Sequence, residues 1–254
     1  MQTRVNTLGN GKNWEDNDLI SVQQTYGDKT TKTGEYKYVE VNGLYRWEPT
    51  VRLRWEREER CELIAWYPSD ITNPYIYNLH TDQSDVTKLK AADLINGYWY
   101  DVPYDYVDIP MQHRMSMVTI VYHVGTADYP NMDISEPQVY SKHTSVYFNR
   151  DDRARGQFVM ITPTANPAWV KAYKHDDGMF SAIVIPGSYI KDEVFLRFKI
   201  GDNIFNAKMK MPTDFEEGKR YIYKLDVGKD KVELTRISVD DLKGWDSNNE
   251  EDLK

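Results

Sequence analysis

The chain has 254 residues, a formal net charge of −8 at pH 7, 40% hydrophobic residues and 28% charged residues. This length allows one large β domain or two domains of about 125 residues each. The balance of apolar and charged residues is typical of a folded chain, and it argues against a disordered or a membrane-spanning protein. Lys and Arg are scattered along the sequence, so the basic stripe of a nucleic-acid-binding protein is missing.

Individual residue types narrow the fold class further. The 19 Tyr and 7 Trp residues favour half-buried, pleated surfaces and therefore indicate β structure. The single cysteine, Cys61, cannot form an internal disulfide, and it lies in an apolar run where we expect it to pack as a small hydrophobic residue. The sequence from Met1 to Arg4 lacks the basic and then apolar pattern of a signal peptide, so an exported form would have lost its leader upstream of Met1.

In the first half of the chain, alternation with a period of two predicts β-strands. Residues 36–41 alternate, Asn42-Gly43 is a dipeptide that favours a tight type I′ turn, and the chain returns over residues 44–47, so we predict a hairpin. One helical turn is expected from Val86 to Ile95. Further strands are predicted at Val51–Trp55, Glu62–Tyr67, Tyr104–Ile109 and Ser116–Val124.

The second half begins after a loop-like segment at residues 125–137, and we place the domain boundary there, giving domains 1–127 and 128–254. Hairpins with short loops are predicted around Gly201-Asp202-Asn203 and Gly228-Lys229-Asp230. Short strands separated by regular turn signals in both halves predict an all-β protein made of two consecutive β-sandwiches. Strands of this half are predicted at Thr144–Phe148, Gln157–Ile161, Ser181–Ile185, Val194–Ile200, Ile204–Met209, Tyr221–Val227 and Val232–Ile237.

The sequence contains no catalytic motif, phosphate-binding loop or dinucleotide fingerprint, so neither an enzyme nor a cofactor is predicted. The five histidines lack the spacing of metal ligands, and we expect His113 to pack or to form a hydrogen bond near the start of a strand. Acidic clusters at residues 16–18, 151–152 and 176–177 lack the glycine and the distal glutamate of a calcium loop, which favours solvated turns.

One aromatic run supports an alternative function. Tyr98, Trp99 and Tyr100 could form a platform on which sugar rings stack, which would make the chain a carbohydrate-binding surface module. The competing interpretation is that these rings pack in the protein core, as aromatic residues of strands usually do.

Eight short segments, in this order and over nearly the whole chain, match the sequence pattern of one known family. They are Trp14–Val22, Tyr45–Pro49, Trp66–Pro68, Asp82-Gln83 with Ala92–Ile95, Met111–Thr119, Ile183–Pro186, Phe215–Tyr223, and Ile237 leading to Trp245. Together they resemble the fimbrillin family of pilus subunits from Gram-negative anaerobes. Met111 and Met117 depart from the family pattern, because they replace an aromatic and a basic residue.

The resemblance implies two β-sandwich domains of transthyretin-like type and export through a lipoprotein precursor to the cell surface and outer membrane. It also implies cleavage of an N-terminal strand at an Arg or Lys, followed by polymerisation through insertion of a donor strand from another subunit. The implied partners are other pilus subunits, and a host protein or glycan stays open as an adhesion partner. The implied function is a fimbrial subunit in cell-surface adhesion.

Two parts of the sequence are candidates for the cleavage site and for the strand that is exchanged between subunits. Arg4 lies in a short terminal segment where a trypsin-like protease could cleave, although it could equally be an exposed terminal charge. Residues 246–254 are polar and acidic, without the alternating apolar side chains that would fill a hydrophobic groove. We therefore expect a tip or accessory subunit, or a strand-exchange segment located elsewhere, at Val232, Leu234 and Ile237.

Overall fold

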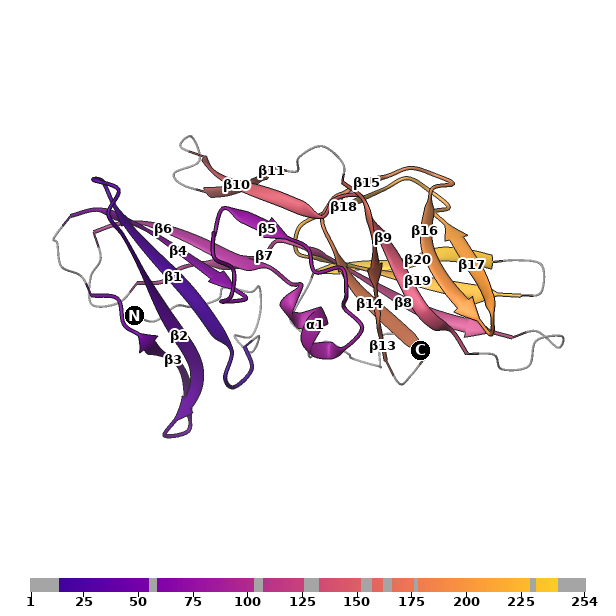
Figure 1. Ribbon diagram of the computed structural model, residues 1–254, viewed down its shortest axis with the longest axis horizontal. Coiled ribbons are helices and arrows are strands. Elements are labelled where there is room, and N and C mark those ends of the chain that lie inside the picture. Colours follow the sequence, from indigo (N-terminus) through magenta and orange to yellow (C-terminus); the bar gives the residue numbers. More distant parts are fainter. Residues whose placement is uncertain are drawn as a thin grey trace.

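The computed structural model describes residues 14–54, 59–102, 107–125, 133–151, 157–161, 166–175, 178–228 and 232–241. Nearly all regular structure in these residues is β-strand, so the predicted all-β sandwich fold is confirmed. The molecule is elongated, with one sheet at its N-terminal end, two facing sheets at its other end and the short helix α1 (Val86–Ala91) between them (Figure 1).

The N-terminal sheet has six strands, and its neighbours in space are mostly neighbours in sequence. The hairpin of β2 (Thr31–Val41) and β3 (Leu44–Val51) turns at Asn42 and Gly43, whose φ angles of 54° and 78° are those of the predicted type I′ turn. In spatial order the strands are β3 (Leu44–Val51), β2 (Thr31–Val41), β1 (Leu19–Tyr26), β4 (Cys61–Tyr67), β6 (Ile95–Asp101) and β7 (Met111–His113).

Two sheets face each other at the C-terminal end. The four-stranded sheet contains β12 (Ala168–Lys171), β9 (Ser135–Ser141), β16 (Val194–Ile200) and β17 (Asn203–Lys208), in that order. The five-stranded sheet contains β13 (Tyr173–Lys174), β14 (Met179–Val184), β8 (Ser116–Val124), β19 (Lys219–Val227) and β20 (Val232–Asp241). Within it, β8 and β19 are parallel, and the other neighbours are antiparallel. A short pair, β15 (Gly187–Tyr189) with β18 (Thr213–Phe215), lies beside them.

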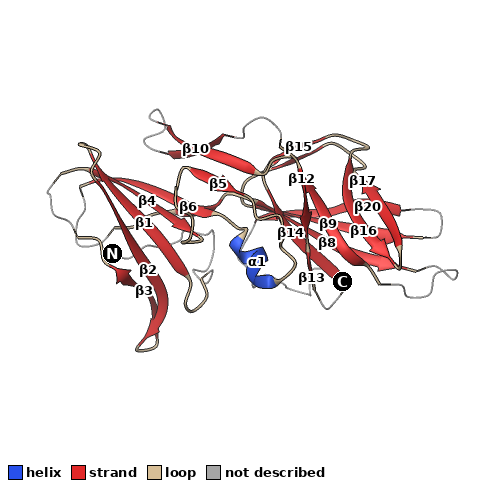
Figure 2. Cartoon of the chain, in the orientation of Figure 1, coloured by secondary structure: helices blue, strands red, loops and turns tan. Residues whose placement is uncertain are grey.

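A small three-stranded sheet bridges the two ends of the molecule (Figure 2). This bridging sheet places β5 (Ile76–Asn78) beside β10 (Ser145–Asp151), which pairs in turn with β11 (Gln157–Ile161). Two sheets therefore draw strands from both sides of residue 127, because β5 pairs with β10 and β8 pairs with β14 and β19. The division of the chain into residues 1–127 and 128–254 stays a prediction.

Two hydrophobic cores hold these sheets together. The N-terminal core covers one face of the N-terminal sheet and includes Ile20, Leu63 and the buried thiol of Cys61. The central core fills the space between the four- and five-stranded sheets and continues to Ile64 and Trp66 on the other face of β4. Cys61 thus packs as predicted, and burial raises the pKa of its thiol.

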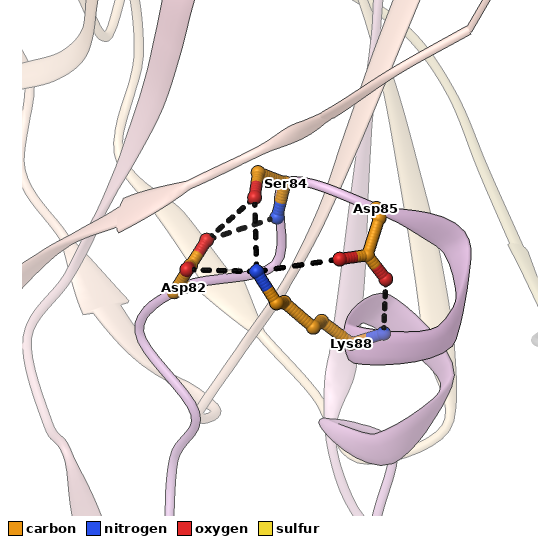
Figure 3. A network of polar contacts seen from close by, with 4 residues as sticks. All are labelled: Asp82, Ser84, Asp85 and Lys88. Carbon is orange, nitrogen blue, oxygen red and sulfur yellow. Dashed lines mark hydrogen bonds and ion pairs between the residues drawn. The ribbon is translucent and has the colours of Figure 1, made fainter.

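The helix α1 (Val86–Ala91) is held by a polar network at its start (Figure 3). Asp85 caps the helix by accepting a hydrogen bond from the backbone N–H of Lys88 at 2.9 Å. The Ser84 hydroxyl donates a hydrogen bond to the Asp82 carboxylate at 2.7 Å, and the Lys88 ammonium lies 3.0 Å from it, so the pKa of Asp82 falls to about 2. Leu89 is the buried residue of this helix. With its six residues α1 cannot span a bilayer, and no other described segment forms a helix of sufficient length and hydropathy.

Several element boundaries differ from the sequence-based predictions. The predicted strand at residues 51–55 is wrong for residues 52–54, because β3 ends at Val51 and the chain then leaves the sheet. The predicted helical turn ends earlier, and Ile95 starts β6 instead. Of the predicted strand at residues 104–109, residues 104–106 lie outside the described parts, and residues 107–109 are not in a strand. Short strands such as β5, β7 and β15 escaped prediction because three residues are too few to show an alternation.

Candidate strand-exchange site

The predicted exchange segment forms β20, which lies at the edge of the five-stranded sheet. It pairs with β19 as an antiparallel hairpin from Val227 opposite Val232 to Lys219 opposite Asp241. Its other side has no neighbouring strand among the described residues, so this side offers backbone N–H and C=O groups for pairing.

The three residues predicted for exchange contact the core unequally. Leu234 is 2% exposed and belongs to the central core, and Val232 is half-buried against it. Ile237 is 55% exposed, because it is the extra residue of a β-bulge between the pairs Ile222–Ser238 and Tyr223–Arg236. Among residues 232–240 of this strand, Leu234 is therefore the one buried side chain.

A groove of about 250 Å³ runs beside β20. Five of the residues that line the groove are apolar or aromatic, namely Met209, Met211, Tyr223, Leu234 and Ile237. The other four lining residues are Lys210, Thr213, Thr235 and Arg236. Burial raises the pKa of Tyr223 to about 12. The groove is thus an apolar depression beside a free sheet edge, and these two features together could receive an extended strand.

Lys210, in the segment between β17 and β18, also contacts β20. The Lys210 ammonium donates a hydrogen bond to Thr235 at 3.1 Å and lies 3.4 Å from the Glu233 carboxylate. These contacts are exposed and contribute little to stability. Apart from its pairing with β19, β20 is therefore held by the exposed polar contacts of Lys210 and by the buried side chain of Leu234.

The other predicted site residues lie apart from β20. Arg4 is outside the described residues. Tyr98 packs against the central core and donates a hydrogen bond to Glu62 at 3.1 Å, whereas Trp99 packs against the N-terminal core. Because successive side chains of a strand point to opposite faces, Trp99 does not share a face with Tyr98 and the exposed Tyr100. The structure does not bring the three rings together on one face, and a role for them in glycan stacking stays a prediction.

His113 forms a hydrogen bond at the end of β7, as predicted for a histidine near a strand start. Its Nδ1 lies 2.7 Å from the carboxylate of Asp93, and both side chains are buried. Burial alone would lower the pKa of His113, but the charge and the hydrogen bond of Asp93 outweigh it and raise this pKa. In the described parts of the chain, no group of three or more His, Cys, Asp or Glu side chains could hold a metal ion.

Comparison with known proteins assigns the family. A sequence profile of fimbrillin-like proteins matches residues 3–241. The chain belongs to the fimbrillin-like family. This is a family of fimbrial structural subunits, which are cell-surface proteins, and the assignment agrees with the resemblance that the sequence pattern indicated.

Several solved structures have a fold similar to that of this fimbrillin-like chain. A candidate cell adhesion protein from Bacteroides uniformis is 18% identical with a TM-score of 0.64, covering 91% of this chain and 94% of that one. A second from Bacteroides ovatus is 16% identical with a TM-score of 0.62, covering 94% of each chain. The tip fimbrial protein Mfa3 from Porphyromonas gingivalis, truncated at its C-terminus, is 8% identical with a TM-score of 0.52, covering 89% of this chain and 95% of that one. At these identities the similarity concerns the fold. A search of curated protein sequences found no match.

Proposed function

We propose that this fimbrillin-like chain is a tip or accessory subunit of a fimbrium and joins other subunits by strand exchange at β20. The observation that carries this proposal is the edge position of β20, with Leu234 as its single fully buried anchor. A strand that leaves this edge exposes Leu234, whose burial is worth about 2–3 kcal/mol, the half-buried Val232 and one row of backbone groups. An equivalent strand from another subunit would restore this burial and this pairing, so an exchange is close to balanced in free energy.

The apolar groove beside β20 supports the same proposal. An incoming strand gains affinity from backbone hydrogen bonds along the edge and specificity from side chains that enter pockets beside it. The side chains of Met209 and Met211 are flexible and polarisable, so they adapt to different apolar partners.

Sequence composition favours the tip or accessory role. Residues 246–252 carry Asp and Glu without alternating apolar side chains, so this segment is a poor donor for an apolar groove. A subunit with a poor donor segment fits a position where it accepts a strand or ends a fibre. Adhesion at the outer membrane, after release from a lipoprotein precursor, is the cellular setting that this role requires.

A disulfide lock tests whether β20 exchanges. Lys224 and Thr235 are opposite each other on β19 and β20 and both are exposed, so a double Cys substitution at these positions can form a cross-strand disulfide. In a Cys61→Ala background, we expect the oxidised lock to prevent assembly of the processed chain and reduction to restore it, as followed by size-exclusion chromatography and electron microscopy. The matched control locks Lys199 to Ile204 on β16 and β17, and it should assemble in both redox states.

The outcomes of this experiment separate the parts of the proposal. Equal assembly of the oxidised lock and the control would mean that β20 stays in place. Long homopolymeric fibres that form only when β20 is free would support exchange but contradict a tip or accessory role.

Processing at Arg4 is tested by a second experiment. Trypsin treatment of the full-length precursor should release a short N-terminal piece and leave a stable core, and Arg4→Gln should block this cleavage. Mass spectrometry of the products identifies the cut. A uniform digest of the chain would contradict the proposed processing.

A further inference from the structure

The outer face of the four-stranded sheet carries a row of polar side chains that crosses all four strands. The strand register aligns Lys171 of β12, Gln138 of β9, Arg197 of β16 and Asn206 of β17. The neighbouring residues Val170, Val139, Leu196 and Ala207 are buried in the central core, so the polar row faces away from it. Figure 2 shows the strands of this sheet at the C-terminal end of the molecule.

Two aromatic rings lie next to this row. Trp169 of β12 is directly opposite Tyr140 of β9, and their ring centroids are 5.2 Å apart at an interplanar angle of 57°. The guanidinium carbon of Arg197 lies 4.2 Å from the centroid of the Trp169 ring. All three side chains are partly exposed. Stacking on the indole orients the guanidinium and leaves its N–H groups directed sideways, where they can bind an anionic group.

The polar groups of the row have unused hydrogen-bonding capacity. Within the described parts of the chain, the side chains of Gln138, Arg197 and Asn206 have no hydrogen-bonding partner. Two amides and a guanidinium on neighbouring strands therefore present donors and acceptors to the solvent at spacings of about 5 Å.

The charge on this face is opposite to that of the whole protein. The chain has a net charge of −8, yet Lys171 and Arg197 bring two positive charges to this row and no carboxylate lies in it. Two acidic side chains close to the row in the strand pairing already have partners, because Glu136 pairs with Lys199 at 2.7 Å and Asp82, next to Lys171, pairs with Lys88 at 3.0 Å. An anionic ligand is the complement of such a face.

We propose that this face binds an acidic oligosaccharide. The stacked Arg197 guanidinium binds the carboxylate or sulfate, Gln138 and Asn206 bind ring hydroxyls, and Tyr140 with Trp169 packs against the apolar face of a sugar ring. A nucleic acid would require a denser basic surface.

An acidic peptide fits this face less well than a glycan. An extended peptide gains much of its affinity from backbone hydrogen bonds at a sheet edge, and a sheet face offers side chains only. The acidic segment of this chain from residue 245 to residue 254 is the natural competitor, and it is included in the test.

The proposed binding does not depend on strand exchange, because β20 belongs to the other sheet. The test therefore uses the full-length, unprocessed chain, and failure of assembly would leave its result unaffected.

Isothermal titration calorimetry tests the proposal with four probes. These are a hexasaccharide of uronic acids, a sulfated hexasaccharide, a neutral hexasaccharide and a synthetic peptide of residues 245–254. We expect an acidic hexasaccharide to bind at least about tenfold more tightly than the neutral one, and Arg197→Gln to remove that advantage. The preferred acidic probe identifies the anionic group as carboxylate or sulfate.

Matched variants separate the site from a general effect of charge. Arg46→Gln removes an exposed Arg from β3, in another sheet, and should leave binding unchanged. Tyr140→Ala should weaken binding of the acidic sugar, and circular dichroism establishes that each variant is folded. Equal affinity for acidic and neutral sugars, binding that survives Arg197→Gln, no binding of either acidic sugar, or tighter binding of the peptide would overturn the proposal.

Discussion

At the residue scale, buried polar side chains join segments that are far apart in the sequence. Gln83 is fully buried, accepts a hydrogen bond from the Ile183 backbone N–H at 2.7 Å and donates to the Ile183 carbonyl at 2.9 Å. It also donates to the His80 carbonyl at 2.9 Å. This single amide therefore holds the segment before α1 against β14.

Replacing Gln83 should destabilise the protein strongly. In Gln83→Ala the backbone groups of Ile183 lose their partners while they stay buried, and each unpaired group costs about 1–3 kcal/mol. We expect the free energy of unfolding in urea to fall by about 2–4 kcal/mol. Gln112→Ala, at an exposed position on β7, is the control and should change it by less than about 0.5 kcal/mol. Equal losses in the two variants would contradict this role of Gln83.

The buried His113–Asp93 pair makes stability depend on pH. The pKa of His113 in the folded state is raised above its ordinary value of 6.5. The stabilisation from the charged pair is therefore complete below about pH 6.5 and is lost as the pH rises through the folded pKa.

We expect the stability difference between the wild type and His113→Gln to be larger at pH 5.5 than at pH 8, because the charged pair stabilises the folded state only while His113 is protonated. Urea unfolding at both pH values measures this difference, and NMR titration of His113 measures its pKa. His123→Gln, at an exposed position on β8, is the control for the general effect of replacing a histidine by glutamine. A difference for His113→Gln that stays constant or grows with pH would rule out the charged pair.

At the scale of single elements, turns and bulges decide where strands begin and end. The β2–β3 hairpin turns at Asn42-Gly43 because both residues adopt positive φ angles. The bulge at Ile237 interrupts the alternation of β20, and Val239 and Asp240 after it are exposed. Local backbone geometry thus specifies the turn of the β2–β3 hairpin. In β20, it leaves few side chains packed against the core.

The glycines of the N-terminal sheet allow a direct test of this geometry. Gly43 has a φ of 78°, which an L-residue rarely adopts, and a Cβ at this position would meet nothing within 4 Å. Gly43→Ala should therefore lower the free energy of unfolding by about 1 kcal/mol through backbone strain alone. Gly27→Ala is the matched control, because its Cβ is equally free and its φ is not in the positive region. This control should be neutral or slightly stabilising in thermal unfolding, and a loss as large as that of Gly43→Ala would refute the argument from strain.

At the scale of the whole molecule, the link between β7 and β8 couples the N-terminal sheet to the five-stranded sheet. Arg114 lies in this link, donates a hydrogen bond to Asn96 of β6 at 2.6 Å and pairs with Glu217, before β19, at 3.0 Å. Close by, Ser116 donates to the Glu216 carbonyl at 2.7 Å. These contacts, with the bridging sheet, favour cooperative unfolding of the molecule.

Breaking this link should lower both stability and cooperativity. Arg114→Met keeps much of the apolar stem but removes the guanidinium, so Asn96 and Glu217 lose their partner at a cost of about 2–4 kcal/mol. We expect the calorimetric unfolding transition to broaden or split. Arg60→Met removes an exposed pair in which Arg60 lies 3.5 Å from Asp101, and it should cost less than about 0.5 kcal/mol. One sharp transition with unchanged stability in Arg114→Met would show that the link is not needed.

The sequence alone determined the features that depend on local chemistry. Alternation with a period of two identified most of the longer strands, the Asn42-Gly43 dipeptide specified its turn, and the apolar run around Cys61 predicted burial. Only the tertiary structure decided which strands share a sheet, that Tyr98 and Trp99 face different cores, and that Arg197 stacks on Trp169. The physical reason is the separation of the partners. Gln83 and Ile183 are 100 residues apart, and no local pattern encodes a contact over that distance.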